Sequence, residues 1–174
     1  MKLSEIGEEA LIERISKLNA LPQSAPGLIV GVGDDAAVLA PDTDGKLTLV
    51  TTDMLTENVD FKLDLITPYQ LGWKSAAVNI SDIAAMGGDP TWTFPSLGFR
   101  PDTEVEFVDD FYRGMSDCAS RFGSIIAGGD MNSLDGDYVI SLTQLGKVSP
   151  DRLALRSKGR AGDQILVTGW LGNS

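Results

Sequence analysis

The spacing of apolar and polar positions divides the chain into helical and extended segments. Helical spacing of apolar residues predicts helices over 4–18, 68–86 and about 104–122. Apolar or alternating runs predict strands over 28–32, 46–51, 91–99, 124–127, 138–148 and 164–168, with a further apolar stretch at 36–40. The helix over 68–86 is the best delimited, because Thr67 can cap it, Pro68 suits its first turn and Gly87-Gly88 ends it.

This order of elements favours an α/β or α+β layered fold over an all-helical or all-strand one. Pro95 indicates that the strand over 91–99 lies at a sheet edge or carries a bulge. No linker divides the chain, so we expect one domain over 1–174. The last predicted strand is followed by a loop, 169–174, which suggests that this domain belongs to a longer protein.

The amino-acid composition excludes several kinds of catalytic and metal-binding site. The 174 residues include 25 Asp and Glu against 14 Lys and Arg, a formal net charge of −11, with no histidine and one cysteine, Cys118. These counts exclude a Ser-His-Asp triad, a histidine metal ligand, an internal disulfide and a cysteine-rich zinc site. A metal would have to be held by oxygen, as Mg²⁺, Mn²⁺ or Ca²⁺ are.

The negative charge argues against nucleic acid or an anionic membrane surface as a partner. A phosphorylated ligand would need cations to bridge it to so acidic a protein. The first residues have no basic segment followed by an apolar core, and no run approaches the length of a membrane span. We therefore expect a cytoplasmic protein.

Carboxylates follow three of the apolar runs. Asp34 and Asp35 follow LIVGVG, Asp53 follows KLTLVTT, and Asp130 follows SIIAGG. Strand ends beside glycine are places where side chains converge on a ligand in layered folds. The sequence GVGDDA also fits a dinucleotide-binding fingerprint, but Pro41 and Gly45 leave no room for the helix that this motif requires.

A fourth carboxylate lies inside the helix over 68–86. Ser75, Asn79 and Asp82 form one polar line, at i, i+4 and i+7, on an otherwise apolar helix. Such a line must face water or a polar site that supplies its hydrogen-bond partners. Carboxylates that converge repel one another unless a cation lies between them, so convergence here would predict a metal site. Arg156, in a local basic cluster, is a candidate to reach a phosphate.

Five segments, taken together and in order, resemble thiamine-monophosphate kinases, a family within the superfamily of aminoimidazole ribonucleotide synthetase-like ATP-binding enzymes. They are GVGDDAAVL (31–39), LVTTDML (49–55), GWKSAAVNISDIAAMGGDP (72–90), GGD (128–130) and LRSKGRAGDQILVTG (155–169). The resemblance implies a mixed, largely antiparallel sheet packed against helices. It also implies direct transfer of the γ-phosphate of ATP to thiamine monophosphate, without a phosphoenzyme, giving thiamine diphosphate.

The resemblance further implies a set of site residues. The family's Mg²⁺-binding positions match Asp35, Thr51, Thr52, Asp53, Asp82 and Asp130. Its ATP-binding positions match Tyr112, Gly129, Asp130 and Arg156, although Tyr112 taken alone reads as a structural residue beside Phe111. The family's N-terminal domain pairs across a two-fold axis, so that sheets from two subunits form a barrel, which implies a homodimer. Phosphoryl transfer asks for positioning and charge neutralisation rather than a strong base, so it is compatible with a chain without histidine.

The sequence departs from the family pattern in two places. Where the family reads G-V-H-F, with a histidine that contacts the substrate, this chain has Asn58-Val59-Asp60-Phe61, which puts Asp60 at the substrate-binding position. Met131 replaces the threonine of the family's GGDT. The family is also about twice as long. The resemblance therefore implies an N-terminal ATP- and Mg²⁺-binding and dimerisation domain, without its C-terminal domain and inactive alone.

Two other functions compete with the kinase. One is an ATP-dependent, amidine-forming synthetase of the same superfamily, acting on a purine-precursor ribonucleotide. The other is a metal-binding domain without catalytic activity. Ligand preference separates them, because only the kinase should be stabilised by thiamine monophosphate.

Overall fold

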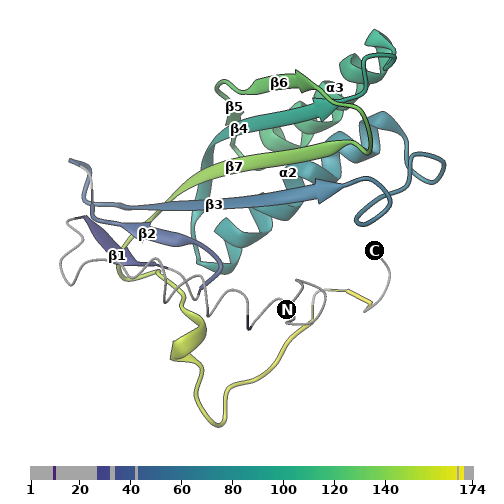
Figure 1. The fold of residues 1–174 in the computed structure, drawn as a ribbon. Coiled ribbons are helices and arrows are strands. Elements are labelled where there is room, and N and C mark those ends of the chain that lie inside the picture. The colour runs from purple at the N-terminus through teal and green to yellow at the C-terminus, as the bar shows by residue number, and fades with distance from the viewer. Residues whose placement is uncertain (1–9, 11–26, 32–33, 42, 168, 171–174) are drawn as a thin grey trace.

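The computed structural model describes residues 10, 27–31, 34–41, 43–167, 169 and 170 (Figure 1). The helix predicted over 4–18 lies outside these residues except at Ala10. The strand predicted over 164–168 is wrong, because 164–167 have no regular structure and 168 lies outside the described residues. Ile165 and Leu166 are 94% and 84% exposed, so among the residues described they have no packing that would hold them in a strand.

A mixed, seven-stranded sheet forms one layer of the described chain. Its strands run in the order β1-β2-β3-β7-β4-β5, and β6 also pairs with β4. Strand pairs are antiparallel except for β4 with β5 and β4 with β6, which are parallel. The strand bounds are β1 Leu28–Val30, β2 Ala37–Leu39, β3 Leu47–Thr56, β4 Asp89–Phe99, β5 Ile125–Ile126, β6 Asp130–Ser133 and β7 Val139–Val148. The predicted fold class, a largely antiparallel sheet with helices, is confirmed.

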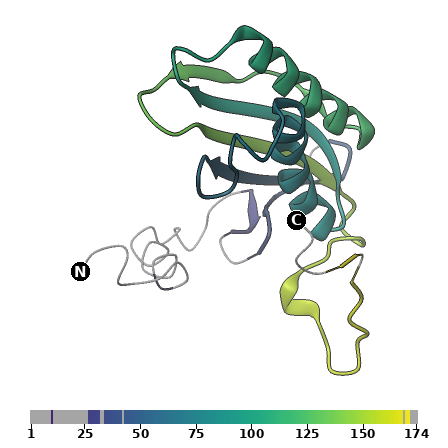
Figure 2. The same cartoon turned by 90° about the vertical axis from the view of Figure 1, so that its right-hand side faces the viewer.

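Two helices, α2 (Pro68–Ala85) and α3 (Val105–Arg121), form the second layer and cover one face of the sheet (Figure 2). They lie against each other through two glycines: a Cβ on Gly72 would come within 1.9 Å of the Phe111 carbonyl oxygen, and one on Gly114 within 1.9 Å of that of Tyr69. Glycine at both positions therefore sets the close approach of the helices. Neither helix is long and apolar enough to cross a membrane.

The predicted start of α2 is confirmed. The Gln70 N–H donates to the Thr67 hydroxyl, and the Thr67 N–H donates to the Gln70 side chain, a reciprocal capping box. After the helix, Gly87 has φ of +75°, and a Cβ there would lie 2.4 Å from the Arg152 carbonyl oxygen. The chain therefore needs glycine to leave the helix at this point.

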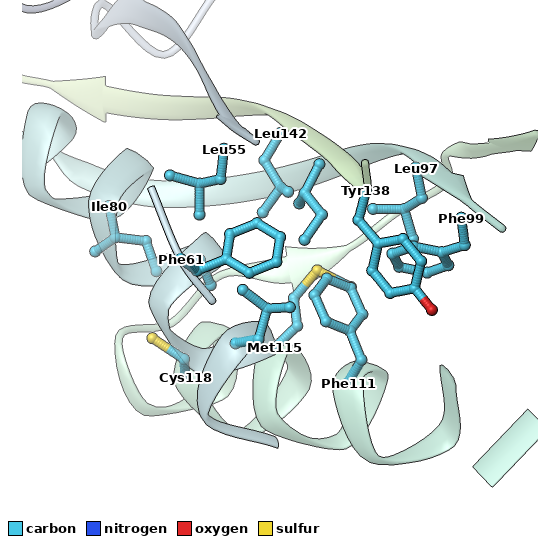
Figure 3. Packing of buried hydrophobic residues seen from close by; sticks show 13 residues of the cluster. Leu55, Phe61, Ile80, Leu97, Phe99, Phe111, Met115, Cys118, Tyr138 and Leu142 are labelled. Atoms are coloured by element: carbon cyan, nitrogen blue, oxygen red, sulfur yellow. The ribbon is translucent and has the colours of Figure 1, made fainter. Parts of the chain in front are cut away.

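The hydrophobic core lies between the two layers (Figure 3). Buried side chains alternate along β7, where Ile140, Leu142 and Gln144 face the helices. Aromatic rings of Phe99, Phe111 and Tyr138 pack together at one end, with Phe99 to Phe111 ring centroids 5.6 Å apart. A second cluster, around Leu49 and Ile83, fills the other end.

Two strand predictions need correction. The strand predicted to end at Thr51 continues to Thr56, because β7 pairs with β3 along its full length, from Leu47 opposite Val148 to Thr56 opposite Val139. Asp53 thus lies within a strand rather than at its end. The strand that contains Pro95 is not at an edge, since β7 lies on one side and β5 and β6 on the other, and its irregularity falls between Pro90 and Trp92.

Candidate metal and nucleotide site

Strand β3 and helix α2 bring two of the predicted carboxylates together. Alternation along β3 turns Thr51 and Asp53 toward α2, where Asp82 projects from the second half of the helix. The Thr51 hydroxyl donates a 2.7 Å hydrogen bond to Asp82 Oδ2. Asp53 and Asp82 also line one open pocket of about 540 Å³, the carboxylate pocket, with Lys74, Ala77, Val78 and Ser81.

The rest of the polar line on α2 fixes this arrangement. The Asp53 main-chain N–H donates to Asn79 Oδ1 at 2.9 Å, and Asn79 Nδ2 donates to the Ser75 carbonyl oxygen at 3.1 Å. The Ser75 hydroxyl donates to the Leu71 carbonyl oxygen at 2.8 Å. Both Ser75 and Asn79 are buried, but only Asn79 joins the helix to the strand, since the Ser75 hydroxyl bonds within α2, while Asp82 reaches the pocket.

The two carboxylates repel each other. Burial, and then the negative charge of Asp82, raise the pKa of Asp53 above its usual range. A cation held between them would remove this penalty. The donors at hand are two carboxylates and a hydroxyl, all oxygen, and Mg²⁺ is commonly held by one or two carboxylates together with substrate phosphates.

The wider set of predicted metal residues does not form a single cluster. No group of three or more Asp, Glu, Cys or His side chains that could hold a metal occurs within the described part of the chain. Asp130 begins β6, and the pairings Asp53–Leu142, Leu142–Pro95 and Ser96–Asp130 place it three strands from Asp53, about 14 Å away.

The predicted position Thr52 faces away from the helices. Its hydroxyl donates to the Leu142 carbonyl oxygen at 3.0 Å on the open face of the sheet. Thr52 could therefore reach a cation at Asp53 only through its main chain.

Asp34 and Asp35 lie between β1 and β2 and already have a cationic partner. The Arg156 guanidinium forms a salt bridge with Asp35, and the Arg156 main-chain N–H donates to Asp34 Oδ2 at 3.2 Å. Arg156 begins a short 3₁₀ helix, Arg156–Lys158. The hydrogen bond and charge of Asp35, followed by the charges of Asp34 and Asp82, raise the pKa of Arg156.

Three of the four predicted ATP-binding residues meet in a separate pocket. Tyr112, Gly129 and Asp130 line an open pocket of about 520 Å³, the glycine pocket, together with 126–128 and Met131. A Cβ on Gly129 would lie 2.4 Å from the Pro95 carbonyl oxygen, so the loop can follow this path only with glycine. Burial raises the pKa of Tyr112. The fourth residue, Arg156, is held by Asp35 and does not line this pocket.

Asp60, at the predicted substrate-binding position, has its carboxylate engaged locally. Asp60 Oδ2 accepts a 2.7 Å hydrogen bond from the Thr56 main-chain N–H, which closes the turn that follows β3. Asn58 within this turn has φ of +65°, a conformation that asparagine tolerates better than most residues. Asp60 also lines a pocket of about 530 Å³, the loop pocket, whose other residues are Val59, Phe61, Lys62, Leu65, Ile66, Gln70 and Lys74.

Two charged groups were not predicted from the sequence. Lys74 lines both the loop pocket and the carboxylate pocket, and its Nζ donates to the Asp60 carbonyl oxygen at 2.7 Å. Its spacing before Asp82, eight residues on one helix face, is a signal that could have identified it. The second is Glu57, whose Oε2 lies 2.6 Å from Arg100 Nη1 near the end of β3.

Comparison with known proteins shows the family to which the chain belongs. The model of the family described as "AIR synthase related protein, N-terminal domain" matches residues 33–148. A thiamine-monophosphate kinase of Synechococcus elongatus is 33% identical over 99% of this chain and 50% of its own length, and that of Bacillus subtilis is 37% identical over 83% and 44%. A solved structure, AaThiL complexed with AMPPCP and TMP, superimposes with a TM-score of 0.74 at 34% identity over 86% of this chain and 44% of that one.

The chain spans about half the length of the curated relatives it matches. The family match covers the strands and helices that carry Asp53, Asp82 and the glycine pocket. The chain belongs to the AIR synthase related protein family, and the matched region is that family's N-terminal domain.

Proposed function

We propose that this chain is the N-terminal part of a thiamine-monophosphate kinase, which transfers the γ-phosphate of ATP to thiamine monophosphate. The observation that carries the proposal is the Asp53–Asp82 pair, two carboxylates that line one open pocket, of which Asp82 accepts a hydrogen bond from Thr51, in a chain whose relatives are kinases of this name. A related structure binds AMPPCP and TMP, which supports the same pair of substrates here. Direct transfer between them, without a phosphoenzyme, is what the resemblance to the kinase family implies, and it calls for positioning and charge neutralisation rather than a strong base.

Mg²⁺ is the cation that fits the proposed site. Asp53 and Asp82 would hold it, with Thr51 fixing the orientation of Asp82, and Asp34 and Asp35 offer a second acidic position once Arg156 is displaced. When bound, Mg²⁺ neutralises phosphate charge. The contribution of this chain is to fix the Asp53 main chain, whose N–H donates to Asn79, and to orient the Asp82 carboxylate through the hydrogen bond from Thr51.

ATP would occupy the glycine pocket. Gly129 lets the chain pass close to Pro95, which leaves main-chain groups accessible beside Asp130 and the half-buried Tyr112 ring. Asp130 carries a negative charge, so a nucleotide phosphate beside it requires a bridging cation, as the resemblance to the kinase family implies. Arg156 would leave Asp35 to reach the nucleotide.

The proposal includes a homodimer. The sheet face opposite the helices carries exposed apolar side chains, Met54 on β3 and Trp92 and Phe94 on β4. Exposed apolar patches of this kind mark interaction surfaces. A second copy of the chain, placing its own open face here, would cover them.

The proposal also includes further polypeptide in the active enzyme and a cytoplasmic setting. The exposed Ile165, Leu166 and Trp170 offer apolar surface that a further domain would cover, and the kinase relatives are about twice as long as their matched regions. The single cysteine, Cys118, is free and buried, which suits a reducing compartment. We expect no phosphoryl transfer by the 174-residue chain alone.

The test is an assay of the protein expressed from its complete reading frame. With ATP and Mg²⁺, it should convert thiamine monophosphate to thiamine diphosphate, detected by chromatography, and a purine-precursor amide should give no product. Conversion of the amide to an amidine, without turnover of thiamine monophosphate, would replace the kinase proposal with the synthetase. Binding of Mg²⁺ without nucleotide binding or turnover would leave only a metal-binding domain.

A further inference from the structure

Lys74 connects the two pockets on either side of it. It projects from α2 about two helical turns before Asp82. It lines the carboxylate pocket with Asp53 and Asp82. It also lines the loop pocket, where its Nζ donates a 2.7 Å hydrogen bond to the Asp60 carbonyl oxygen. The two pockets therefore meet at one side chain, and that side chain is a cation.

The charges make this position unusual. The carboxylate pocket is lined by Asp53 and Asp82, and among its described lining residues Lys74 alone is basic. A phosphate ester that approaches two carboxylates is repelled unless positive charge lies on its path. Lys74 supplies a compact charge with three donors, of which the structure uses one on Asp60.

The loop pocket has the wall composition of a small-molecule site. Val59, Phe61, Leu65 and Ile66 give it apolar sides, and its polar and charged lining residues are Asp60, Lys62, Gln70 and Lys74. Of its two lysines, Lys74 is the one that also lines the carboxylate pocket. An apolar pocket with a few polar groups suits a flat heterocycle with one charged end. Such a ligand would place its charged end at Lys74, on the side that opens to Asp53 and Asp82.

We propose that Lys74 binds the phosphate of the acceptor substrate and directs it from the loop pocket toward the Asp53–Asp82 pair. This inference rests on the proposed kinase function and adds a substrate-binding residue to it. In this arrangement the Asp60 carboxylate is not a substrate ligand, since it closes the turn after β3 by accepting from Thr56. The substrate contact at this end of the pocket comes from Lys74 instead.

A structural role for Lys74 makes a different prediction. If the side chain served only to hold the 57–66 loop through the Asp60 carbonyl oxygen, its removal would disturb the whole loop pocket. Binding of thiamine monophosphate and of thiamine, which lacks the phosphate, would then weaken together. If Lys74 binds the phosphate, only the phosphorylated ligand is affected.

The experiment measures binding of both ligands to the complete protein by calorimetry, together with steady-state kinetics. In Lys74→Met we expect binding of thiamine monophosphate to weaken at least tenfold, binding of thiamine to change less than twofold, and KM for ATP to stay within twofold. Lys74→Arg should recover part of the loss, because it retains the charge. Lys46→Met, which removes a lysine from the exposed turn before β3, is the matched control and should behave as wild type.

Each outcome is decisive. If the affinities for thiamine monophosphate and thiamine weaken equally in Lys74→Met, or if neither changes, the assignment of Lys74 is overturned. The kinase proposal still stands in that case, provided that the wild-type enzyme is active. A wild-type protein that neither binds nor turns over thiamine monophosphate overturns the kinase proposal itself, and the assignment of Lys74 with it.

Discussion

The Thr51 hydroxyl lies 2.7 Å from Asp82 Oδ2, and this hydrogen bond joins the middle of β3 to the second half of α2. Both residues are distant from the chain termini and 31 positions apart, so the bond depends on the packing of the helix on the sheet. It orients one of the two carboxylates that face the pocket. The proposed cation site is therefore built into the layer contact rather than carried on a loop.

Removal of this bond should lower stability. Thr51→Val keeps the shape of the side chain but takes away the donor to a charged acceptor, so we expect the free energy of unfolding to fall by about 1–2 kcal/mol. Urea unfolding followed by circular dichroism measures the change. Thr48→Val, on the opposite face of the same strand, is the matched control and should cost less than about 0.5 kcal/mol. Equal effects in the two variants would contradict the role of Thr51.

Asp53 should reduce stability when no metal is present. Its pKa is raised by burial and by Asp82, so the folded state binds a proton more readily than the unfolded state does. This penalty exists at pH 7, where Asp53 is charged, and disappears as the pH falls below the unfolded pKa of about 4. Without Mg²⁺, Asp53→Asn should therefore raise the free energy of unfolding at pH 7, by no more than about 0.5 kcal/mol because solvent screens this half-buried carboxyl.

The pH dependence distinguishes this explanation from improved packing. The gain in Asp53→Asn should shrink toward zero at pH 3.5, and Mg²⁺ should stabilise the wild type but not the variant. A gain of the same size at both pH values would show that repulsion from Asp82 is not its source.

Arg156 should compete with a divalent cation. Its guanidinium neutralises Asp35, and its main-chain N–H binds Asp34, so it must leave before a metal can use these carboxylates. In the absence of nucleotide, Arg156→Ala should bind Mn²⁺ more tightly by about two- to fivefold, since exposed ion pairs are weak. Electron paramagnetic resonance counts the free Mn²⁺. Arg160→Ala removes the same charge nearby and should leave the affinity unchanged, and weaker binding in Arg156→Ala would contradict the account.

The Glu57–Arg100 pair should stabilise the far end of β3. Burial raises the pKa of Glu57, but hydrogen bonds from Arg100 and the Tyr138 N–H outweigh it, and the net result is a lowered pKa. The Arg100 guanidinium also stacks 4.1 Å from the centre of the Tyr138 ring. Glu57→Gln should therefore lower the free energy of unfolding at pH 7 by about 2 kcal/mol.

The sign of the pH dependence follows from the lowered pKa. The stability that Glu57 contributes is present above its unfolded pKa of about 4.3 and is lost as the pH falls through the lower folded value. The difference between wild type and Glu57→Gln should therefore narrow below about pH 4 in urea titrations. A difference that grows as the pH falls would refute the assigned interaction.

The long helices and strands of the fold were predictable from the sequence. The two long helices and the strands that became β3, β4 and β7 have clear periodicity and end signals, and α2 begins at the predicted cap Thr67. Strand β6 was missed because all four of its residues are exposed and it has no apolar alternation. The run over 164–168 has strand composition, yet residues 164–167 pair with no strand within the described part of the chain, and composition alone does not reveal this.

The site was predictable to the extent that it follows local spacing. The i, i+4, i+7 line on α2 singled out Asp82, and the position after the run KLTLVTT singled out Asp53. The structure brings both to one pocket, and their role in binding a metal stays a prediction. The salt bridge from Arg156 to Asp35 joins residues 121 positions apart, so only the tertiary structure reveals it. Similarly, the order of the strands in the sheet places Asp130 far from Asp53, and this separation cannot be read from the sequence motifs.

The central claim is that Asp53 and Asp82 together hold the cation for phosphoryl transfer. The most direct measurement is the turnover of thiamine monophosphate by the complete protein carrying Asp53→Asn, Asp82→Asn or both, with Asp109→Asn on the exposed face of α3 as control. We expect each single variant to lose at least about 100-fold in kcat, the double variant to lose little more because the carboxylates act as one unit, and the control to match wild type. Undiminished turnover in either single variant would contradict the claim.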